Sequence, residues 1–556
     1  MTPSSAVSLA PTTSLAVRAA RLWNELHSPV VGRRIPGTVP VAVLAGLASL
    51  LASAWFVTSG LALAYGDALS HLTIARRLAD TMTEPGLGQL GTVWLPVPHL
   101  LLAPFVLTLW AWQSGWGAAA LGACCLAATA SGLYRTAARW GLGLTARLVA
   151  VAVAVLNPSM LYLHSTALTE PVLIAGIAGT LAGLSNWATK RRRLSSGELA
   201  VFAGIPAAVA TMSRYEGWAL VAGGALFVAV LAWLRDRTPG AVVRYAFGFA
   251  VVPFATMLWW LAHNWVTYHD PFAFVSGPYS ASALQADLVA QGLTTKGDAG
   301  SSLATIALAV ATTAGAGTVV LAGLSLVVML LVERSARRWL FVAFTATTTA
   351  FMFVSLYTGQ AVIFNPASSA TSVWNNRYGM AALLGLALVI GIATDEVSLR
   401  LGRRAPGKTR PRRLVLAALV AVVLAGQAVW ASGDWATRAL VLGEAVTQVS
   451  NTGPREAADW LGSHYDGGHI VLDESVAANN ILPLAGISLR EYYLRSNDQL
   501  FEEALADLSG HARWLWVSDS DADAVGRVAA AMPGFDTRFA PAFAAEGVTI
   551  YRAVDR

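Results

Sequence analysis

Residues 38–63 read TVPVAVLAGLASLLASAWFVTSGLAL, and AYGDALSHL follows directly at residues 64–72. The first stretch is apolar over the ~20 residues that a helix needs to cross a bilayer. It follows Arg33 and Arg34, as an export signal would, but its apolar part is roughly twice a signal core of about 7–15 residues. The stretch therefore predicts a first membrane-spanning helix, with the acid and the histidine behind it just outside the membrane.

The rest of the chain has the same apolar character. Of its 556 residues, 55% are hydrophobic and only 13% are charged, whereas a soluble domain has about 25% charged residues. We therefore expect a polytopic α-helical membrane protein. Windows of about 20 apolar residues predict eleven transmembrane helices, near residues 38–63, 115–136, 144–162, 169–188, 198–213, 217–234, 243–266, 302–332, 339–357, 378–395 and 413–432.

Clusters of arginine and lysine predict the orientation. One cluster precedes the first span, and others follow the second, fourth, sixth, eighth and tenth spans, so all of them fall on one side of the membrane. Because cytoplasmic loops are enriched in these residues, we expect the N-terminus inside and the C-terminus outside a cell (plasma) membrane. The clusters account for the net charge of +6, so we expect membrane lipids and no nucleic acid as partners.

The patterns divide the chain into three parts. Residues 1–37 are expected to be a cytoplasmic segment. Residues 38–435 form the transmembrane domain, with a long first outer loop at 64–114 whose helical parts should lie along the membrane interface. Residues 440–556 are predicted to be an extracytoplasmic α/β domain. In that domain, helical patterns at 454–464, 497–507 and 521–531 alternate with strand-like runs at 469–473, 513–518 and 547–552.

The unusual polar residues lie at the outer ends of the spans or in the outer loops. A carrier needs polar groups near the bilayer midplane, and this chain has almost none there. A one-sided set suits chemistry at the outer surface. The set comprises Asp67, His71, Arg76, His99, Glu170, Arg214, Glu216, His269, Asp270 and Arg377.

Two of these residues are candidate catalytic acids. Asp67 and His71 are four residues apart, so they share one face of a helix, and a carboxylate beside the bilayer can act as a general base on a hydroxyl group. Glu170 stands before Pro171 at an expected helix start, as a second acid. Each acid also has a structural interpretation, because Asp67 could cap a helix and Glu170 could complement a helix dipole.

Two arginines are candidate ligands of a phosphate group. Arg377 enters the tenth span at the expected headgroup level, where it could bind a lipid phosphate through paired hydrogen bonds or anchor the helix by snorkelling. Arg214 could face a phosphate or pair with Glu216. Residues 89–99, which contain Trp94, Pro96 and Pro98 and end at His99, could line a groove or anchor the loop at the interface.

Together these segments resemble the GT-C glycosyltransferases, in particular the branch of protein O-mannosyltransferases and aminoarabinose transferases. The resemblance covers residues of about 40–395. It is carried by Gly-Asp-Ala-x-x-His-Leu from residue 66, Asn-Pro at 157, Thr-Glu-Pro at 169, Arg-Tyr-Glu-Gly-Trp at 214, His-Asp-Pro-Phe-Ala-Phe at 269 and Asn-Arg-Tyr-Gly at 376.

The resemblance implies transfer of a mannose- or arabinose-type sugar from a polyprenyl-phosphate donor to a glycan, lipid or protein acceptor of the cell envelope. It implies an inverting reaction with Asp67 as general base, Glu170 as second acid and Arg377 at the donor phosphate. No cofactor is assigned; a divalent cation would use Asp67 and Glu170. The other residues expected to bind donor or acceptor are His71, His99, Arg214, Glu216 and Tyr378.

Two other functions fit the sequence. A non-catalytic exporter of lipid or polysaccharide would need polar residues through the midplane and coupling to nucleotide or ions, and we assign no P-loop. A membrane scaffold would work through the C-terminal domain. It predicts that this domain alone binds the partner and that the carboxylates of the outer loops are dispensable.

Overall fold

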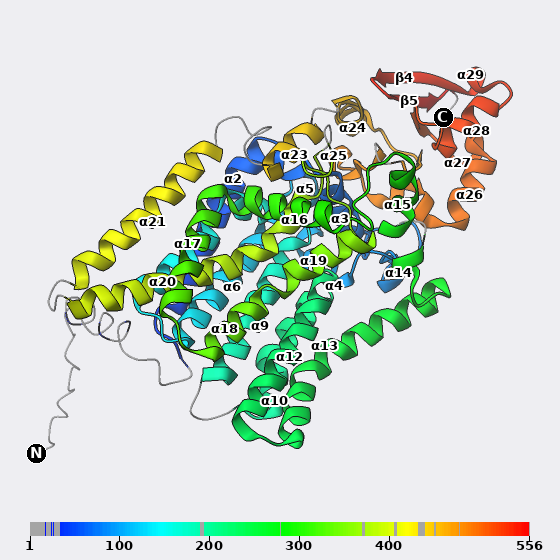
Figure 1. The fold of residues 1–556 in the computed structure, drawn as a ribbon. Coiled ribbons are helices and arrows are strands. Elements are labelled where there is room, and N and C mark those ends of the chain that lie inside the picture. Colours follow the sequence, from blue (N-terminus) through cyan, green and yellow to red (C-terminus); the bar gives the residue numbers. More distant parts are fainter. Residues whose placement is uncertain are drawn as a thin grey trace, which may run out of the picture.

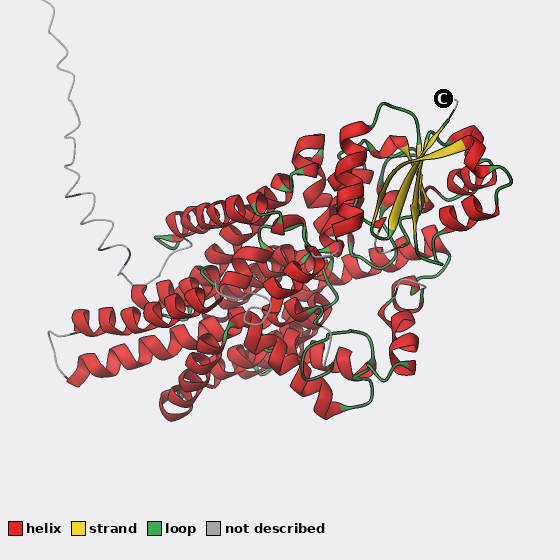
Figure 2. Ribbon diagram, turned by 90° about the horizontal axis from the view of Figure 1, so that it is seen from above, coloured by secondary structure: helices red, strands yellow, loops and turns green. Residues whose placement is uncertain are grey.

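A computed structural model gives the fold of the chain. It describes residues 34–189, 194–277, 280–369, 373–404, 409–431, 440–449, 452–476 and 479–554, with Val17, Asn24 and Leu26. Most of the predicted cytoplasmic segment 1–37 and the basic run at 190–193 lie outside these residues. The described chain is a bundle of helices with one small sheet at one end (Figures 1 and 2).

Within the described ranges, six helices are long and apolar enough to cross a membrane, or eight if each of two bent pairs counts as one span. A polytopic membrane protein is therefore the class that the structure supports. The six are α2 (Thr38–Thr58), α6 (Trp116–Arg139), α9 (Glu170–Thr189), α12 (Glu216–Asp236), α13 (Pro239–Tyr268), and the stretch Asn376–Arg400, which joins η5 (Asn376–Ala382) to α20 (Leu383–Arg404). The pairs are α16 (Ala299–Ala314) with α17 (Ala316–Val332), bent by 107°, and α18 (Ala336–Thr345) with α19 (Thr347–Thr358), bent by 42°.

The predicted count of eleven spans is not confirmed, because two of the apolar windows hold only shorter helices. In the window 144–162, Asn157 caps a new helix through its side chain and Pro158 begins it, so the window is split. The shorter elements are α7 (Leu144–Val155) and α8 (Pro158–Leu163), then α10 (Ser196–Leu199), η4 (Ala200–Gly204) and α11 (Ile205–Thr211). Helix α21 (Thr409–Ala431) lies in the last predicted window and has 23 residues.

The first outer loop consists of short helices, as its amphipathic pattern predicts. Leu107 and Trp110 of this loop are 62% and 66% exposed, which is the expected pattern for side chains at a membrane interface. The loop at residues of about 269–300 is also helical. The elements are η1 (Leu61–Leu63), α3 (Gly66–Arg77), η2 (Leu87–Gln89), α4 (Pro96–Leu102), η3 (Ala103–Val106) and α5 (Leu109–Gln113), then α14 (Ala273–Ser276) and α15 (Ala281–Ala290).

The C-terminal part holds a five-stranded sheet in the order β2-β1-β3-β5-β4. The first three strands are parallel, and β5 runs antiparallel to β3 and β4. All three predicted strands are present, while β2, which is short, and β4, which contains Pro541, were missed. The strands are β1 (Ile470–Leu472), β2 (Tyr492–Leu494), β3 (Trp514–Ser518), β4 (Phe539–Ala545) and β5 (Val548–Ala553).

Helices surround this sheet and precede it. Those at the three predicted positions are α24 (Thr452–His464), α26 (Gln499–Ala506) and α28 (Ala524–Ala531). The others are α23 (Leu440–Val449), α25 (Leu482–Ala485), η7 (Leu489–Glu491), η8 (Arg495–Asn497), α27 (Leu508–His511) and α29 (Phe535–Arg538).

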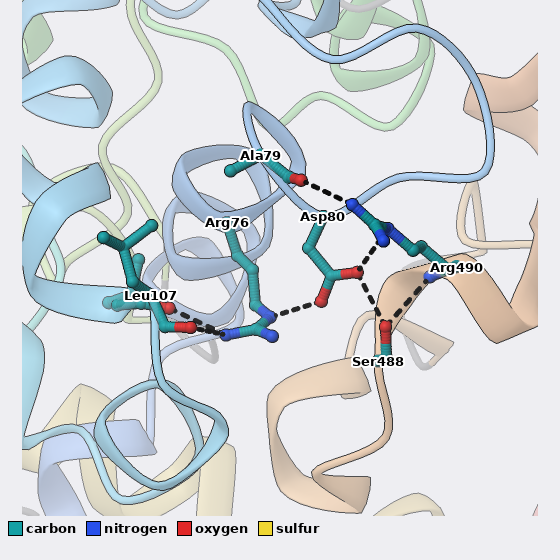
Figure 3. A pocket seen from close by; sticks show the side chains of 7 residues that line it. Arg76, Ala79, Asp80, Leu107, Ser488 and Arg490 are labelled. Carbon is teal, nitrogen blue, oxygen red and sulfur yellow. Dashed lines mark hydrogen bonds and ion pairs between the residues drawn. The ribbon is translucent and has the colours of Figure 1, made fainter.

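The C-terminal part contacts the first outer loop directly. The Asn480 amide donates to the Ser70 hydroxyl of α3, and the Ser488 hydroxyl donates to Asp80 Oδ1 over 2.7 Å. Asp80 also accepts from Arg76 Nε at 2.6 Å. Arg76, Asp80, Ser488 and Arg490 line a pocket of about 280 Å³ between the two parts (Figure 3).

The bundle core depends on small residues where helices meet. Helix α6 packs between α2 and α9 (Figure 1), and a Cβ added at Gly122 of α6 would overlap the His164 carbonyl oxygen. We predict that Gly122→Ala lowers the free energy of unfolding by about 1–3 kcal/mol, as overpacking does. The measurement is the thermal unfolding midpoint in detergent.

The matched control is Gly323→Ala in α17, where an added Cβ meets nothing within 4 Å. This change should raise stability by up to about 1 kcal/mol, because alanine favours helix over glycine. Equal midpoints for the two variants would contradict the packing described for α6.

Candidate functional site

Arg377 lies at the centre of a buried set of charges. Its Nε donates to Glu170 Oε1 at 2.9 Å, and its Nη2 donates to Asp67 Oδ2. The side chains of Arg377 and Glu170 are each 3% exposed, and that of Asp67 is 30% exposed. The structure therefore brings together the two predicted acids and the predicted phosphate ligand, which come from distant parts of the chain.

A second arginine extends this set. Arg214 Nη1 donates to Glu170 Oε1 at 3.0 Å and to the Thr169 hydroxyl at 3.2 Å, while its Nε donates to Glu216 Oε1 at 2.9 Å. We call the series Asp67, Arg377, Glu170, Arg214 and Glu216 the ion-pair chain. Its three carboxylates and two guanidinium groups leave one net negative charge, and Asp67 is the most exposed of the three acids.

Aromatic rings border the two arginines. The Arg214 guanidinium lies 4.3 Å from the centre of the Tyr378 ring, and that of Arg377 lies 5.5 Å from the same ring and 5.1 Å from the Tyr65 ring. Such cation–π contacts hold a guanidinium group in place without consuming its N–H donors. The N–H donors of both arginines can therefore bind the carboxylate oxygens of the site.

Local structure explains how the acids reach Arg377. Asp67 is the second residue of α3, whose N-cap is Tyr65 with no side-chain cap bond, so the interpretation of Asp67 as a helix cap is wrong. Glu170 and Glu216 are the first residues of α9 and α12. All three acids lie in first turns, where the helix dipole favours a negative charge.

The structure also distinguishes between the alternative roles expected for Arg377 and Arg214. Arg377 is buried, which does not fit a guanidinium that snorkels to the headgroups. Arg214 does pair with Glu216, as the structural interpretation expects. It binds Glu170 as well, so the same side chain also belongs to the centre of the site.

His71 and His99 form a buried pair next to the ion-pair chain. His71 Nδ1 and His99 Nε2 are 2.9 Å apart, and the His71 ring lies 4.5 Å from the Trp94 ring. Burial, with His99, Arg377 and Arg214 nearby, holds the pKa of His71 well below its usual value, and burial lowers the pKa of His99 to about 3. Both rings are therefore neutral at pH 7, so one nitrogen donates and the other accepts.

Three other residues singled out in the sequence have different partners. Arg76 binds Asp80 and the carbonyl oxygens of Val106 and Leu107 in the pocket of Figure 3. Asp270 accepts from the Phe272 backbone at 2.8 Å, and His269 ends α13 in the left-handed conformation. These residues organise loops.

Three residues of the site had no role assigned from the sequence. Thr169 accepts from Arg214, and Tyr65 packs on Arg377; they lie one residue before Glu170 and two residues before Asp67. Glu444 was missed although it is the one acid in the apolar helix α23, and an acid in that position is a signal.

Two buried polar atoms at the centre of the site remain available for hydrogen bonds with a ligand. Arg377 Nη1 and Glu170 Oε2 are buried, and neither has a hydrogen-bond partner among the described residues. No group of three or more His, Cys, Asp or Glu side chains in the described part of the chain could hold a metal ion. A buried guanidinium donor without an acceptor can bind an anionic oxygen.

Residues 402–409, GRRAPGKT, have the spacing of a P-loop, which the sequence analysis did not assign. A P-loop follows a strand and opens a helix. Here the first three residues of the motif are the end of helix α20, and the described strands all lie between residues 470 and 553. The motif instead fits the basic connection between two apolar helices, so it gives no support to a nucleotide-driven exporter.

No protein-family model matches the chain, and no curated protein matches it.

The ion-pair chain predicts unequal effects on stability. Arg377→Met leaves the buried Glu170 with one partner fewer, and removing one member of a buried pair costs about 3 kcal/mol or more. Asp67→Asn should change the free energy of unfolding by less than about 1 kcal/mol, because Asp67 is partly exposed. Thermal unfolding in detergent measures both.

Arg490→Met is the control, since the Arg490 side chain is 63% exposed. It should behave like the wild type. If Arg377→Met unfolds at the same temperature as Arg490→Met, the buried charges described here do not stabilise the fold.

Proposed function

We propose that this protein is a membrane glycosyltransferase that moves a mannose- or arabinose-type sugar from a polyprenyl-phosphate donor to a hydroxyl group of a cell-envelope glycan, lipid or protein. The observation that carries the proposal is the contact of Arg377 with both Asp67 and Glu170. A general base and a phosphate ligand are the groups that such a transfer needs.

Asp67 is the proposed general base. The acceptor hydroxyl oxygen attacks the anomeric carbon, its proton passes to Asp67, and the bond from that carbon to the phosphate oxygen breaks. This single displacement inverts the anomeric centre. Asp67 suits the role because it is the most exposed acid of the ion-pair chain and can reach a substrate.

Arg377 is the proposed phosphate ligand. A phosphodiester donor has one negative charge, and the departing phosphate monoester gains a second. Arg377 Nη1 is the buried donor without a described acceptor. When Asp67 takes the proton it loses its charge, so the positive charge of Arg377 becomes available to the phosphate at the moment when that phosphate becomes more negative.

The first outer loop is the proposed cover of the site. The Tyr215 hydroxyl, next to Arg214, donates to the Val93 carbonyl at 2.9 Å, and Tyr268 donates to the Leu90 carbonyl at 2.7 Å. These bonds hold residues 90–93 beside the neutral His71–His99 pair. In this position the loop excludes water from the reacting groups, and His71 and His99 can orient the substrate hydroxyls.

The proposed orientation puts the N-terminus in the cytoplasm and the C-terminal part outside the plasma membrane. The basic clusters support it. The contacts between the C-terminal part and α3 also support it, because they put that part on the same side as Asp67. The reaction would then occur at the outer surface.

Asp67→Asn tests the chemistry. The variant keeps the shape of the side chain but cannot take a proton, so transfer should fall by about a hundredfold or more. Purified protein in liposomes is supplied with a polyprenyl-phosphate sugar labelled in the sugar, and transfer to an envelope acceptor fraction is counted.

Asp270→Asn changes an outer-loop acid that is engaged locally, and it should keep full activity. Wild-type turnover by Asp67→Asn would remove Asp67 from the mechanism. No transfer by the wild type with either sugar would leave the scaffold interpretation, in which the loop acids are dispensable.

Cysteine labelling tests the orientation. In a background with Cys124→Ala and Cys125→Ala, we expect Ser520→Cys to react with a membrane-impermeant maleimide on intact cells. Thr238→Cys should react only after permeabilisation. Both positions are exposed in the structure, so accessibility reports the side of the membrane, and the reverse pattern would refute the orientation.

A further inference from the structure

The turn that carries Arg377 is held by a buried acid from another part of the chain. Asn375 has the left-handed conformation, with φ of 60°, and η5 begins at Asn376. The Asn375 backbone N–H donates to Glu444 Oε1 at 2.6 Å, and that of Asn376 donates to Glu444 Oε2 at 3.0 Å. Each carboxylate oxygen thus binds one backbone amide of the turn, and Oε2 also accepts from the Asn376 side chain at 3.4 Å. The Glu444 side chain is fully buried.

Other bonds fix the same turn from its remaining sides. The Asn375 side chain donates to the Val362 carbonyl at 3.1 Å, and the Asn376 side chain donates to the Phe364 carbonyl at 2.7 Å. Asn365 donates to Asn376 Oδ1 at 2.9 Å. Of these partners of the turn, Glu444 is the one that carries a charge.

The helix that carries Glu444 also contacts the segment of Asp67. The Tyr65 hydroxyl donates to the Val441 carbonyl of α23 at 3.1 Å, and Tyr65 is the N-cap of the helix that begins with Gly66 and Asp67. Helix α23 packs against η1, α8, α16 and η5. It therefore touches the two segments that hold the two ends of the Asp67–Arg377 ion pair.

We propose that Glu444, in its ionised form, is a positioning residue that holds the turn 375–377 so that Arg377 faces Asp67 and Glu170. The consequence for catalysis rests on the proposed transfer reaction. Glu444 contacts the backbone that carries Arg377, and it acts on the reaction through that arginine.

Glu444 changes its ionisation state close to neutral pH. Burial raises its pKa to about 7, against the opposing effects of Arg377 and the Asn375 and Asn376 N–H groups. The other ionisable groups facing it are Tyr65 before α3 and Tyr162 of α8, with Arg455 of α24 facing Tyr162. Helix α16 and η1 contain no ionisable residue.

Protonation should have opposite effects on the turn and on the whole fold. A proton on one carboxylate oxygen weakens the bond that this oxygen accepts, so the turn loosens as pH falls through about 7. The pKa of Glu444 in the folded protein is above its usual value. Glu444 therefore adds most to the free energy of unfolding at low pH, and this contribution is lost as pH rises through about 7. Global unfolding by acid would instead weaken both the turn and the whole fold as pH falls.

Hydrogen–deuterium exchange of the full-length protein in nanodiscs tests the positioning directly. At about pH 8, Glu444→Gln should speed exchange of the Asn375 and Asn376 amides by about tenfold or more, because a charge-assisted bond is lost. The wild type should approach that rate at about pH 6 after correction for intrinsic exchange, while the variant should show no such change.

Glu456→Gln is the matched control, an exposed glutamate of α24, and it should exchange as the wild type does. Glu444→Asp keeps the charge with a shorter reach, so it should give an intermediate rate that still depends on pH. It replaces Glu444→Gln if that variant does not fold. Wild-type protection in the Gln variant, or in the Asp variant when it stands in, would overturn the proposal.

The transfer assay adds a second readout. Glu444→Gln should lower kcat by about tenfold and remove the rise in rate between about pH 6 and about pH 8 that the wild type shows. If the wild type transfers no sugar, the proposed reaction fails, while the exchange experiment still decides the role of Glu444. If the wild type is active and Glu444→Gln keeps its rate and pH profile, the positioning role is wrong.

Discussion

The structure depends on the neutralisation of one buried guanidinium group. Arg377 cannot lose its proton, and leaving its charge unpaired away from water would cost several kcal/mol. Glu170 and Asp67 supply the opposite charges, so α3, α9 and η5 must begin close to one another. The charge of Arg214 must be neutralised in the same way. Its ion pairs with Glu170 and Glu216 bring the start of α12 to the same place.

Helix geometry turns this requirement into a one-sided site. The three acids occupy the first turns of α3, α9 and α12, where the positive ends of the helix dipoles add to the attraction of the arginines. Helices that begin at one end of a bundle can share such a site only there. This is why the residues of the ion-pair chain gather at a single end of the bundle.

The sequence could predict the parts of this arrangement that follow from composition. Long apolar windows predict helices. Acids placed beside these windows, such as Asp67 and Glu170, indicate a structural or functional role. It could not predict that Arg377 would meet both acids, because the contact joins segments far apart in the chain. Nor could apolar windows reveal breaks: Gly315, with φ of 87°, bends one predicted span by 107°.

Glu444 shows why the division at residue 440 hides part of the site. The change in composition there predicts a boundary between a transmembrane domain and an α/β domain, yet α23 packs on η1, α8, α16 and η5. Arg455 of the next helix donates to the Leu63 and Ala64 carbonyls at 2.9 and 3.0 Å, directly before Asp67. A scaffold domain that worked alone would have no need of these buried contacts. They make physical sense if the C-terminal part completes the surroundings of Asp67 and Arg377, because a buried polar turn must find its hydrogen-bond partners wherever the chain can supply them.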